Sequence, residues 1–538
     1  MIPLHVHSEY SLLQSTAGVD QLINTAAEYN LSAIALTDTN GMHGLIRFYK
    51  AANEKGIKPL PGAYIDDPGN KNIYVLLLAK NFKGYSDICR IITTRKLKKE
   101  FSLEHLLRED FPDLFIITHS LELLQKIPLR ENIFAELIST RYEQKKTRSL
   151  YEFCISNGVK YVASNPIYFL NKDDYLIHQT VTAIRTGTTI ENINSADLAD
   201  EEFYFKDPAQ IEKIWRKLPD ALNNIEFIKD DCNVDLGLGR YKFPVYPSDE
   251  DPFSLLWQLS FEGLSKRYNP VTPQAKERLL YELNVINDLH LSNYFLVVWD
   301  ILKEARRRGM ITIGRGSAAN SIVSYCLGFT EIDPIKHNLY FERFLNKSRS
   351  SPPDIDMDFS WRERDEIVRY VFEKYGYEYV AFISTHVTFK ARSAFRETAK
   401  VFGFSDAEIS KISKYIPWTD ARNLPDVPEL FPEAKSLKLN IEPWKTITNT
   451  AAKLANFPRH LSIHPGGIII APEPITTYTA LEYAQNKGVG LIITQPDMHG
   501  IEDLGLVKID LLSQRGLGVL RSTIEQIDYN NSLLNSYD

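Results

Sequence analysis

Short apolar runs recur along the first 235 residues of the chain, and amphipathic stretches separate them. The runs predict buried strands, while the stretches between them carry apolar residues at helical spacing. This alternation favours a parallel β/α arrangement, either open or closed into a barrel. The expected strands cover residues 32–37, 74–79, 114–118 and 160–164, and two of the expected helices cover 19–29 and 45–54.

The pattern changes near residue 236, where glycine and proline punctuate the chain as far as residue 249. Such punctuation is typical of a domain boundary. Beyond it, Thr272 and Pro273 predict the N-cap and first turn of a helix. A second helix is expected around residues 295–307.

A short buried strand is expected at residues 310–313, followed by a glycine turn and a helix that opens at Ala318. In the turn, Gly316 lets the backbone approach a ligand, and the following helix presents free N–H groups to an anion. Arg315 and Ser317 add donors suited to triphosphate oxygens. A tight turn without a ligand is the alternative when this segment is considered alone.

Three acids, Asp354, Asp356 and Asp358, alternate with the apolar residues Ile355 and Met357. In a strand, alternate positions share one face, so the carboxylates would line one surface above a core. Several like charges side by side need a positive partner, and a pair of Mg²⁺ ions with oxygen ligands would supply it. The alternative is an acidic edge strand, or a turn after the preceding double proline.

A further acid, Asp510, lies on a later apolar run that also carries Lys508. A lone aspartate on a buried strand needs an explanation. A glycine–serine turn, an alternating acidic strand and a neighbouring acidic strand together form the layout of a nucleotidyltransferase palm.

Composition narrows the class of protein. The 44% hydrophobic and 24% charged residues are ordinary for a folded soluble chain. The net charge of −7 means that a nucleic-acid partner would have to meet a local basic surface. Four scattered cysteines without a CxxC pair argue against a zinc ribbon or a disulfide framework and fit a reducing compartment. We find neither a signal peptide nor an apolar run long enough to span a membrane, and expect a cytoplasmic, nucleoid-associated protein.

The opening of the chain carries His5 and His7, expected on one face of a strand, and Asp38 at the end of another. Two histidines at this spacing can share a metal at the end of a barrel. The segment resembles the PHP (polymerase and histidinol phosphatase) domain, a distorted β/α barrel that can hold a trinuclear metal site. The similarity rests on residues 4–11, 35–38 and 56–62.

Several positions depart from the metal-binding pattern of that family. Thr39 stands where a histidine is needed, Tyr64 where a glutamate is usual and Tyr74 where another histidine is usual, and Asn165 begins a segment that lacks an aspartate and a histidine. Affinity depends on ligand number, so we expect a structural barrel without a PHP metal cluster. A PHP-type phosphoesterase, with His43 as a substitute ligand, is the alternative.

The rest of the chain resembles the C-family replicative polymerases, and the similarity runs through the whole chain in the same order of parts. The matching motifs cover residues 294–300, 314–321, 341–346, 353–359, 392–396, 464–467, 494–497 and 506–510. The resemblance implies that Asp354, Asp356 and Asp510 are the catalytic, Mg²⁺-binding aspartates, and that Asp358 is not a metal ligand. It implies two-metal nucleotidyl transfer from a dNTP to a primer 3′-OH.

Further site residues follow from this resemblance. Gly316 and Ser317 would hold the triphosphate, with Arg315 and Lys508 as charge partners. A basic set between the acidic strands suits the backbone of primer–template DNA, although each member is equally an ordinary surface charge. This set consists of Lys390, Arg392, Arg396 and Arg459.

The expected fold is a multidomain α/β protein: a PHP-like barrel (1–235), a palm in two parts (236–385 and 463–515), an inserted helical thumb (386–462) and the start of the fingers (516–538). Chains of this family continue well beyond the third aspartate, so most of the fingers would be missing here. We therefore expect a DNA-directed DNA polymerase whose activity alone is in question. Expected partners are the sliding clamp, a proofreading exonuclease or a separate fingers-bearing chain; the alternative is a non-catalytic remnant or DNA-binding scaffold.

Overall fold

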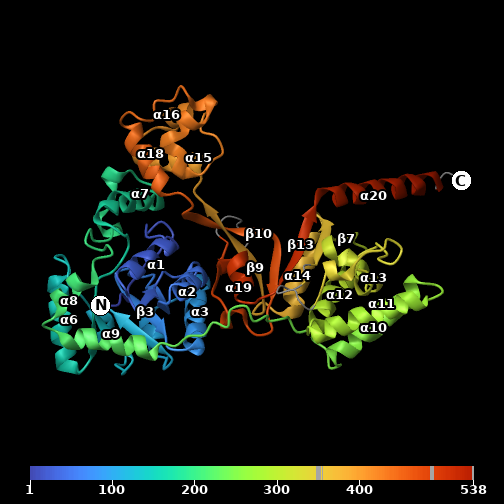
Figure 1. Ribbon diagram of the computed structural model, residues 1–538, viewed down its shortest axis with the longest axis horizontal. Coiled ribbons are helices and arrows are strands. Elements are labelled where there is room, and N and C mark those ends of the chain that lie inside the picture. The colour runs from blue at the N-terminus through green and yellow to red at the C-terminus, as the bar shows by residue number, and fades with distance from the viewer. Residues whose placement is uncertain (347–352, 354, 485–489, 536–538) are drawn as a thin grey trace. The chain divides into compact units, whose positions relative to one another are not determined.

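The computed structural model describes residues 1–346, 353, 355–484 and 490–535, and is a mixed α/β protein, as predicted (Figure 1). The chain forms two compact units. The first contains residues 1–236, 384–462 and 476–500, and the second contains residues 237–383, 463–475 and 501–538. Two long strands, β9 (Val380–Thr388) and β10 (Pro458–Ile470), contribute residues to both units.

A six-stranded sheet, in the order β1-β2-β3-β4-β5-β6, forms the centre of the first unit. Its strands are β1 (Ala33–Leu36), β2 (Lys58–Asp66), β3 (Tyr74–Ala79), β4 (Leu114–Thr118), β5 (Ile133–Ile138) and β6 (Lys160–Ser164). The strands predicted at β1, β3, β4 and β6 are confirmed, whereas β2 and β5 were not predicted. The expectation of a parallel sheet is wrong in part, because β3 runs antiparallel to both β2 and β4.

The opening segment was predicted as a strand, but it forms only an isolated bridge from Val6 to Ile167. Its backbone still bonds to both ends of the sheet: Thr37 N–H donates to Val6 O, and His7 N–H donates to Ile167 O. The segment therefore links β1 to the chain that follows β6 and closes the sheet into a distorted barrel. This places His5 and His7 inside the barrel without a regular strand.

Helices surround this sheet, and two of them, α1 and α2, match the prediction. Burial of one face of each amphipathic helix against the sheet accounts for their positions. They are α1 (Val19–Glu28), α2 (Leu45–Glu54), α3 (Phe82–Leu97), α4 (Leu103–Leu106), α5 (Leu121–Lys126), α6 (Gln144–Asn157), α7 (Tyr175–Thr186), α8 (Pro208–Trp215) and α9 (Pro219–Asp231).

A helical cluster follows β9 and also belongs to the first unit (Figure 1). Its core includes Phe395, Ile447 and Ala451, and it packs against Ile177 and Val181 of α7. The cluster consists of α15 (Ala391–Val401), α16 (Asp406–Ser413), α17 (Val427–Leu430) and α18 (Trp444–Lys453), and the unit also contains β11 (Leu481–Tyr483) and β12 (Ile492–Asp497), with α19 (Met498–Asp503) at its border.

In the second unit, β10, β13, β8 and β7 are successive neighbours in one sheet. Thr272 caps α11 by accepting a hydrogen bond from Ala275 N–H, as the sequence predicts. Helices α10 to α13 gather beside the strands (Figure 1). The elements are α10 (Pro252–Arg267), α11 (Pro273–Asp288), α12 (Ser292–Arg307), β7 (Thr312–Arg315), α13 (Ile322–Cys326), β8 (Asp356–Ser360), α14 (Arg364–Tyr375), β13 (Lys508–Gln514) and α20 (Arg515–Asn535).

Candidate functional site

Two acidic residues meet on neighbouring strands of the second unit. Strands β8 and β13 run parallel, and their register places Asp356 beside Asp510. Residues in register on adjacent strands project from the same face, and Asp358 shares that face because it lies two positions along β8. Met357 and Phe359 point the other way and are fully buried. The predicted face therefore holds Asp356, Asp358 and Asp510, whereas Asp354 lies outside the described residues.

The two carboxylate oxygens of Asp510 have different surroundings. Lys508 Nζ lies 2.6 Å from Asp510 Oδ2, whereas Oδ1 is buried and has no hydrogen-bond partner among the described residues. A buried carboxylate oxygen without a partner is costly and calls for a further ligand. His464 Nδ1 lies 3.9 Å away and accepts a hydrogen bond from Gly467 N–H at 2.7 Å.

His464 was not among the predicted site residues, although its motif contributed to the resemblance. Its place follows from the strand pairing, because Gly467 stands opposite Asp510 on β10. A side chain at position 467 would come within 2.7 Å of His464 Nδ1 and 3.3 Å of Asp510 Oδ1. Glycine at this position therefore keeps the space beside the open carboxylate oxygen.

Asp358 has a protein partner at each of its two carboxylate oxygens. Arg315 Nε lies 2.7 Å from Asp358 Oδ2, and Gln514 Nε2 donates to Oδ1 at 3.3 Å. Arg315, which the sequence suggested as a triphosphate ligand, is thus held beside the acidic strand. Its register position opposite Asp356 keeps a positive charge at this face.

The glycine turn begins later than predicted. Residues 310–311 are not in a strand, and β7 extends through Gly314 and Arg315. This is an edge strand with Ile313 48% exposed, so the prediction of a buried strand is wrong. The residues after it form a 3₁₀ helix, Gly316–Asn320, and α13 begins only at Ile322. The physical reason is an internal cap: Ser321 accepts a hydrogen bond from Ser324 N–H and donates to the buried Glu282 at 2.7 Å.

The donor set at this face fits a divalent metal. Asp356 and Asp510 offer hard carboxylate oxygens from adjacent strands, and Oδ1 of Asp510 is open. Among the described residues no group of three or more His, Cys, Asp or Glu side chains is arranged to hold a metal ion. The two described acids therefore supply only part of the ligand set that such a metal would need.

The four predicted DNA-contacting bases all lie in the first unit and make contacts within it. Arg392 Nη2 donates to Ile416 O at 2.6 Å, and Lys390 Nζ donates to Asn456 at 2.6 Å. Arg396 pairs with Asp406 and Arg459 pairs with Glu397. The charges of Arg396 and Arg459 are thus partly neutralised, whereas Lys390 and Arg392 have neutral partners in these contacts.

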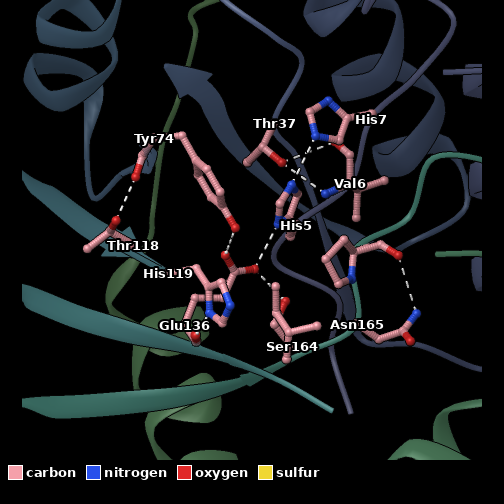
Figure 2. Close-up of polar contacts among 12 residues, drawn as sticks. His5, Val6, His7, Thr37, Tyr74, Thr118, His119, Glu136, Ser164 and Asn165 are labelled. Carbon is pink, nitrogen blue, oxygen red and sulfur yellow. Dashed lines mark hydrogen bonds and ion pairs between the residues drawn. The ribbon is translucent and has the colours of Figure 1, made fainter. Parts of the chain in front are cut away.

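The barrel places His5 and His7 in a buried polar cluster. Figure 2 shows His5, Tyr74 and Ser164 converging on the carboxylate of Glu136. The distances to the Glu136 oxygens are 2.7 Å from His5 Nδ1, 2.7 Å from the Tyr74 hydroxyl and 2.6 Å from Ser164 Oγ. Burial alone would raise the pKa of Glu136, but the charge and hydrogen bond of His5 lower it to about 2.

The side chains of His7 and Asp38 also form hydrogen bonds within the protein. His7 Nε2 lies 3.0 Å from His5 Nε2, and His7 Nδ1 lies 2.9 Å from Ser11 Oγ. Burial, followed by the charge of His5, lowers the pKa of His7 well below its usual value. Asp38 accepts hydrogen bonds from Ser8 and Ser11. Because these ring nitrogens and oxygens bind one another, the residues present do not fit a PHP metal cluster.

Glu136 was missed by sequence reasoning, and the only signal for it was one acid inside an apolar run. His43 was considered a substitute ligand, but its Nε2 lies 2.6 Å from Glu482 Oε1. This contact is a buried hydrogen bond that engages Nε2 of the ring and joins distant segments of the first unit.

Known protein families match two segments of the chain. Residues 3–156 match the PHP domain, and residues 254–513 match the bacterial DNA polymerase III alpha NTPase domain. The chain is 33% identical to an error-prone DNA polymerase of Symbiobacterium thermophilum, over 98% of this chain and 52% of that protein. It is 32% identical to the DNA polymerase III subunit alpha of Bacillus subtilis, over 99% and 50%.

A third relative, the DNA polymerase III subunit alpha of Ureaplasma parvum, is 33% identical over 99% of this chain and 52% of its own length. Among solved structures, an amidohydrolase from Chromobacterium violaceum covers 31% of this chain and 87% of its own at 14% identity, but the TM-score of 0.22 is too low to carry an argument. The chain spans about half the length of the curated relatives it matches. The chain is therefore similar to bacterial DNA polymerase III alpha subunits both in its PHP part and in its NTPase part.

Proposed function

We propose that this chain supplies the metal-binding strands of a DNA-directed DNA polymerase that transfers nucleotides from dNTPs to a primer 3′-OH. One observation carries the proposal: Asp356 and Asp510 stand in register on adjacent strands, and Asp510 Oδ1 is buried with no hydrogen-bond partner in the described part of the chain. Asp354 would complete the set of catalytic aspartates. Two Mg²⁺ ions bound there would activate the primer hydroxyl and stabilise the leaving pyrophosphate.

The protein groups around the acids have separate roles. Lys508, 2.6 Å from Asp510, fixes that carboxylate and balances its charge. Arg315, held by Asp358, keeps a positive charge beside the acidic face, where it would attract triphosphate oxygens. Gly316 has open space around its α-carbon, so its backbone is accessible to a phosphate, and Ser317 adds a hydroxyl.

The substrates and partners we propose are primer–template DNA, dNTPs, and replication proteins such as a sliding clamp or a proofreading exonuclease, all met at the bacterial nucleoid in the cytoplasm. Within the described residues, no helix has the length and hydropathy needed to cross a bilayer. Because the matched relatives are about twice as long, we also propose that a fingers-bearing segment acts together with these strands. Trp361 and α20 border a cavity of about 410 Å³ with exposed Val519 and Ile527 beside it, which supports packing of a further segment there.

Primer extension with Mg²⁺ tests the proposal, first with the chain alone and then with the second half of the Bacillus subtilis relative added. We expect extension in at least one arm, its loss in Asp356→Asn and Asp510→Asn, and its retention in Asp230→Asn, which replaces an exposed acid of α9. Extension that survives Asp356→Asn would contradict the site. DNA binding without synthesis in either arm would favour a non-catalytic scaffold.

A further inference from the structure

A loop of the helical cluster displays a large aromatic side chain to solvent. Trp418 is 79% exposed, and Tyr415, three residues earlier, is 40% exposed. Single exposed aromatics are common on protein surfaces, but two on one short loop expose a sizeable apolar area. The loop lies between α16 and the 3₁₀ helix Ala421–Asp426.

The protein holds this loop in place on both sides of Trp418. Ile416 is fully buried, and its carbonyl accepts hydrogen bonds from Arg392 Nη2 at 2.6 Å and Nε at 3.2 Å. On the other side, Ala391 N–H donates to Thr419 O at 3.1 Å. Both contacts come from the N-terminal end of α15. A ring presented from an anchored loop loses little backbone freedom when it binds a partner.

Positive charge surrounds the aromatic pair. Arg392 donates to a neutral carbonyl, so this contact leaves its charge unbalanced, and Lys414 Nζ lies 4.8 Å from the centre of the Tyr415 ring. The nearby acid, Asp420, is paired with Arg422 at 3.0 Å. The hydrogen bonds from the Arg422 side chain lower the pKa of Asp420 far below its usual value, so this acid stays paired and ionised. The loop surface thus combines exposed rings with positive charge.

This combination matches the chemistry of nucleic-acid strands. Aromatic rings stack on the faces of bases whatever the sequence, while lysine and arginine contact the phosphates. An acidic protein surface would use the charges but has no need for an exposed indole, and a purely apolar partner would be disfavoured by Arg392 and Lys414. Charge and ring together therefore favour a nucleic acid.

We propose that Trp418 stacks on an exposed nucleobase of the DNA substrate while Arg392 and Lys414 contact the adjoining phosphates. The choice of DNA rests on the polymerase function proposed above. The base could come from a single-stranded overhang or from a duplex end, since both present an open ring face. In either case Trp418 is a DNA-binding residue and takes no part in the chemistry at the aspartates.

Fluorescence anisotropy of labelled DNA, titrated with the full chain without divalent metal, tests this inference. The probes are a single-stranded oligonucleotide, a primer–template with an overhang, a blunt-ended duplex and a hairpin-capped duplex without open ends. For Trp418→Ala we expect about tenfold weaker binding to the first two probes, because stacking contributes that order of affinity per base. Trp418→Phe should retain most of the affinity. If Trp418→Ala also binds the blunt duplex more weakly than the wild type does, the base that Trp418 contacts comes from a duplex end.

Tyr142→Ala is the matched control, because Tyr142 is 74% exposed in another part of the same unit, and it should bind like the wild type. A plot of log affinity against log salt concentration should have a shallower slope for Lys414→Ala, by about 0.9 or less. Unchanged binding in Trp418→Ala, or an equal loss in Tyr142→Ala or with the capped hairpin, would overturn the inference and leave the aspartate test intact. No binding of the wild type to any probe would overturn this inference, whereas the proposed polymerase function is decided separately by primer extension with the second half of the Bacillus subtilis relative added.

Discussion

His43 and Glu482 lie 439 residues apart in the sequence, yet His43 Nε2 and Glu482 Oε1 are 2.6 Å apart and both side chains are buried. Lys96 Nζ lies 3.1 Å from the other carboxylate oxygen, and Gln495 donates to Oε1 at 3.1 Å. Burial alone would raise the pKa of Glu482, but the charges of Lys96 and His43 lower it to about 2. This carboxylate therefore ties β11 to helix α3 and to the turn that precedes α2.

Replacing Glu482 with glutamine should lower the free energy of unfolding by about 3 kcal/mol at pH 7, because it removes one partner of a buried pair. The folded pKa lies below the ordinary value of 4.5, so the stabilisation is present above pH 4.5 and is lost as the pH falls toward 2. Urea unfolding at pH 7 and pH 4 measures both effects. The exposed pair of Glu122 and Lys126 gives the control, since Glu122→Gln should change stability by less than about 0.5 kcal/mol.

Glu9 should contribute to pH dependence with the opposite sign. Burial raises its pKa to about 8, although Val19 N–H donates to its carboxylate. The folded state then keeps a proton that the unfolded state releases above pH 4.5, so this residue reduces stability as the pH rises from 4.5 to 8. Glu9→Gln keeps an acceptor for Val19 and cannot ionise. We expect its free energy of unfolding to exceed that of the wild type by about 4 kcal/mol at pH 8 and to be close to it at pH 4.5.

Urea unfolding across this pH range checks the Glu9 prediction. Glu28→Gln, at the exposed end of the same helix that Glu9 contacts, should follow the wild type at every pH. A constant difference between Glu9→Gln and the wild type from pH 4.5 to 8 would contradict the raised pKa.

Gly314 of strand β7 can be compared with Gly316, which begins the 3₁₀ helix that follows. An alanine β-carbon at 314 would lie 1.9 Å from Phe329 O, a backbone atom that cannot move aside easily. We expect Gly314→Ala to cost at least about 2 kcal/mol and to displace β7. Gly316 has φ +75° and open space, so Gly316→Ala should cost only about 1 kcal/mol from backbone strain. Thermal unfolding of both variants decides this, and an equal cost would contradict the predicted collision.

Asp358 should matter less for metal binding than Asp510, because Arg315 and Gln514 bind both of its carboxylate oxygens, whereas Asp510 Oδ1 has no hydrogen-bond partner among the described residues. Mn²⁺ binding, followed by electron paramagnetic resonance, should weaken at least about tenfold in Asp356→Asn and Asp510→Asn. Asp358→Asn should weaken it clearly less. An equal loss in all three variants would assign Asp358 to the metal site.

Continuous apolar runs made β3, β4 and β6 predictable, because a strand buried on both faces has no polar positions to interrupt it. β2 was not predicted because it contains Pro59, Pro61 and Gly62, and proline and glycine are typical of turns. β5 was hidden by Glu136, a charge in the middle of an apolar run. That charge is tolerated because His5, Tyr74 and Ser164 bind it, and such partners come from segments that no local pattern connects.

The sequence by itself determined that Asp356 and Asp358 share a face, since the two-residue period of a strand is local geometry. It also predicted the similarity to bacterial DNA polymerase III alpha subunits, because the motifs occur in order along the whole chain. Only the tertiary structure decided that Asp510 stands beside Asp356 while Arg315 pairs with Asp358, and that His43 pairs with Glu482. The physical reason is that the charge state and availability of a side chain depend on burial and on partners within a few ångströms, which strand register and chain folding bring together.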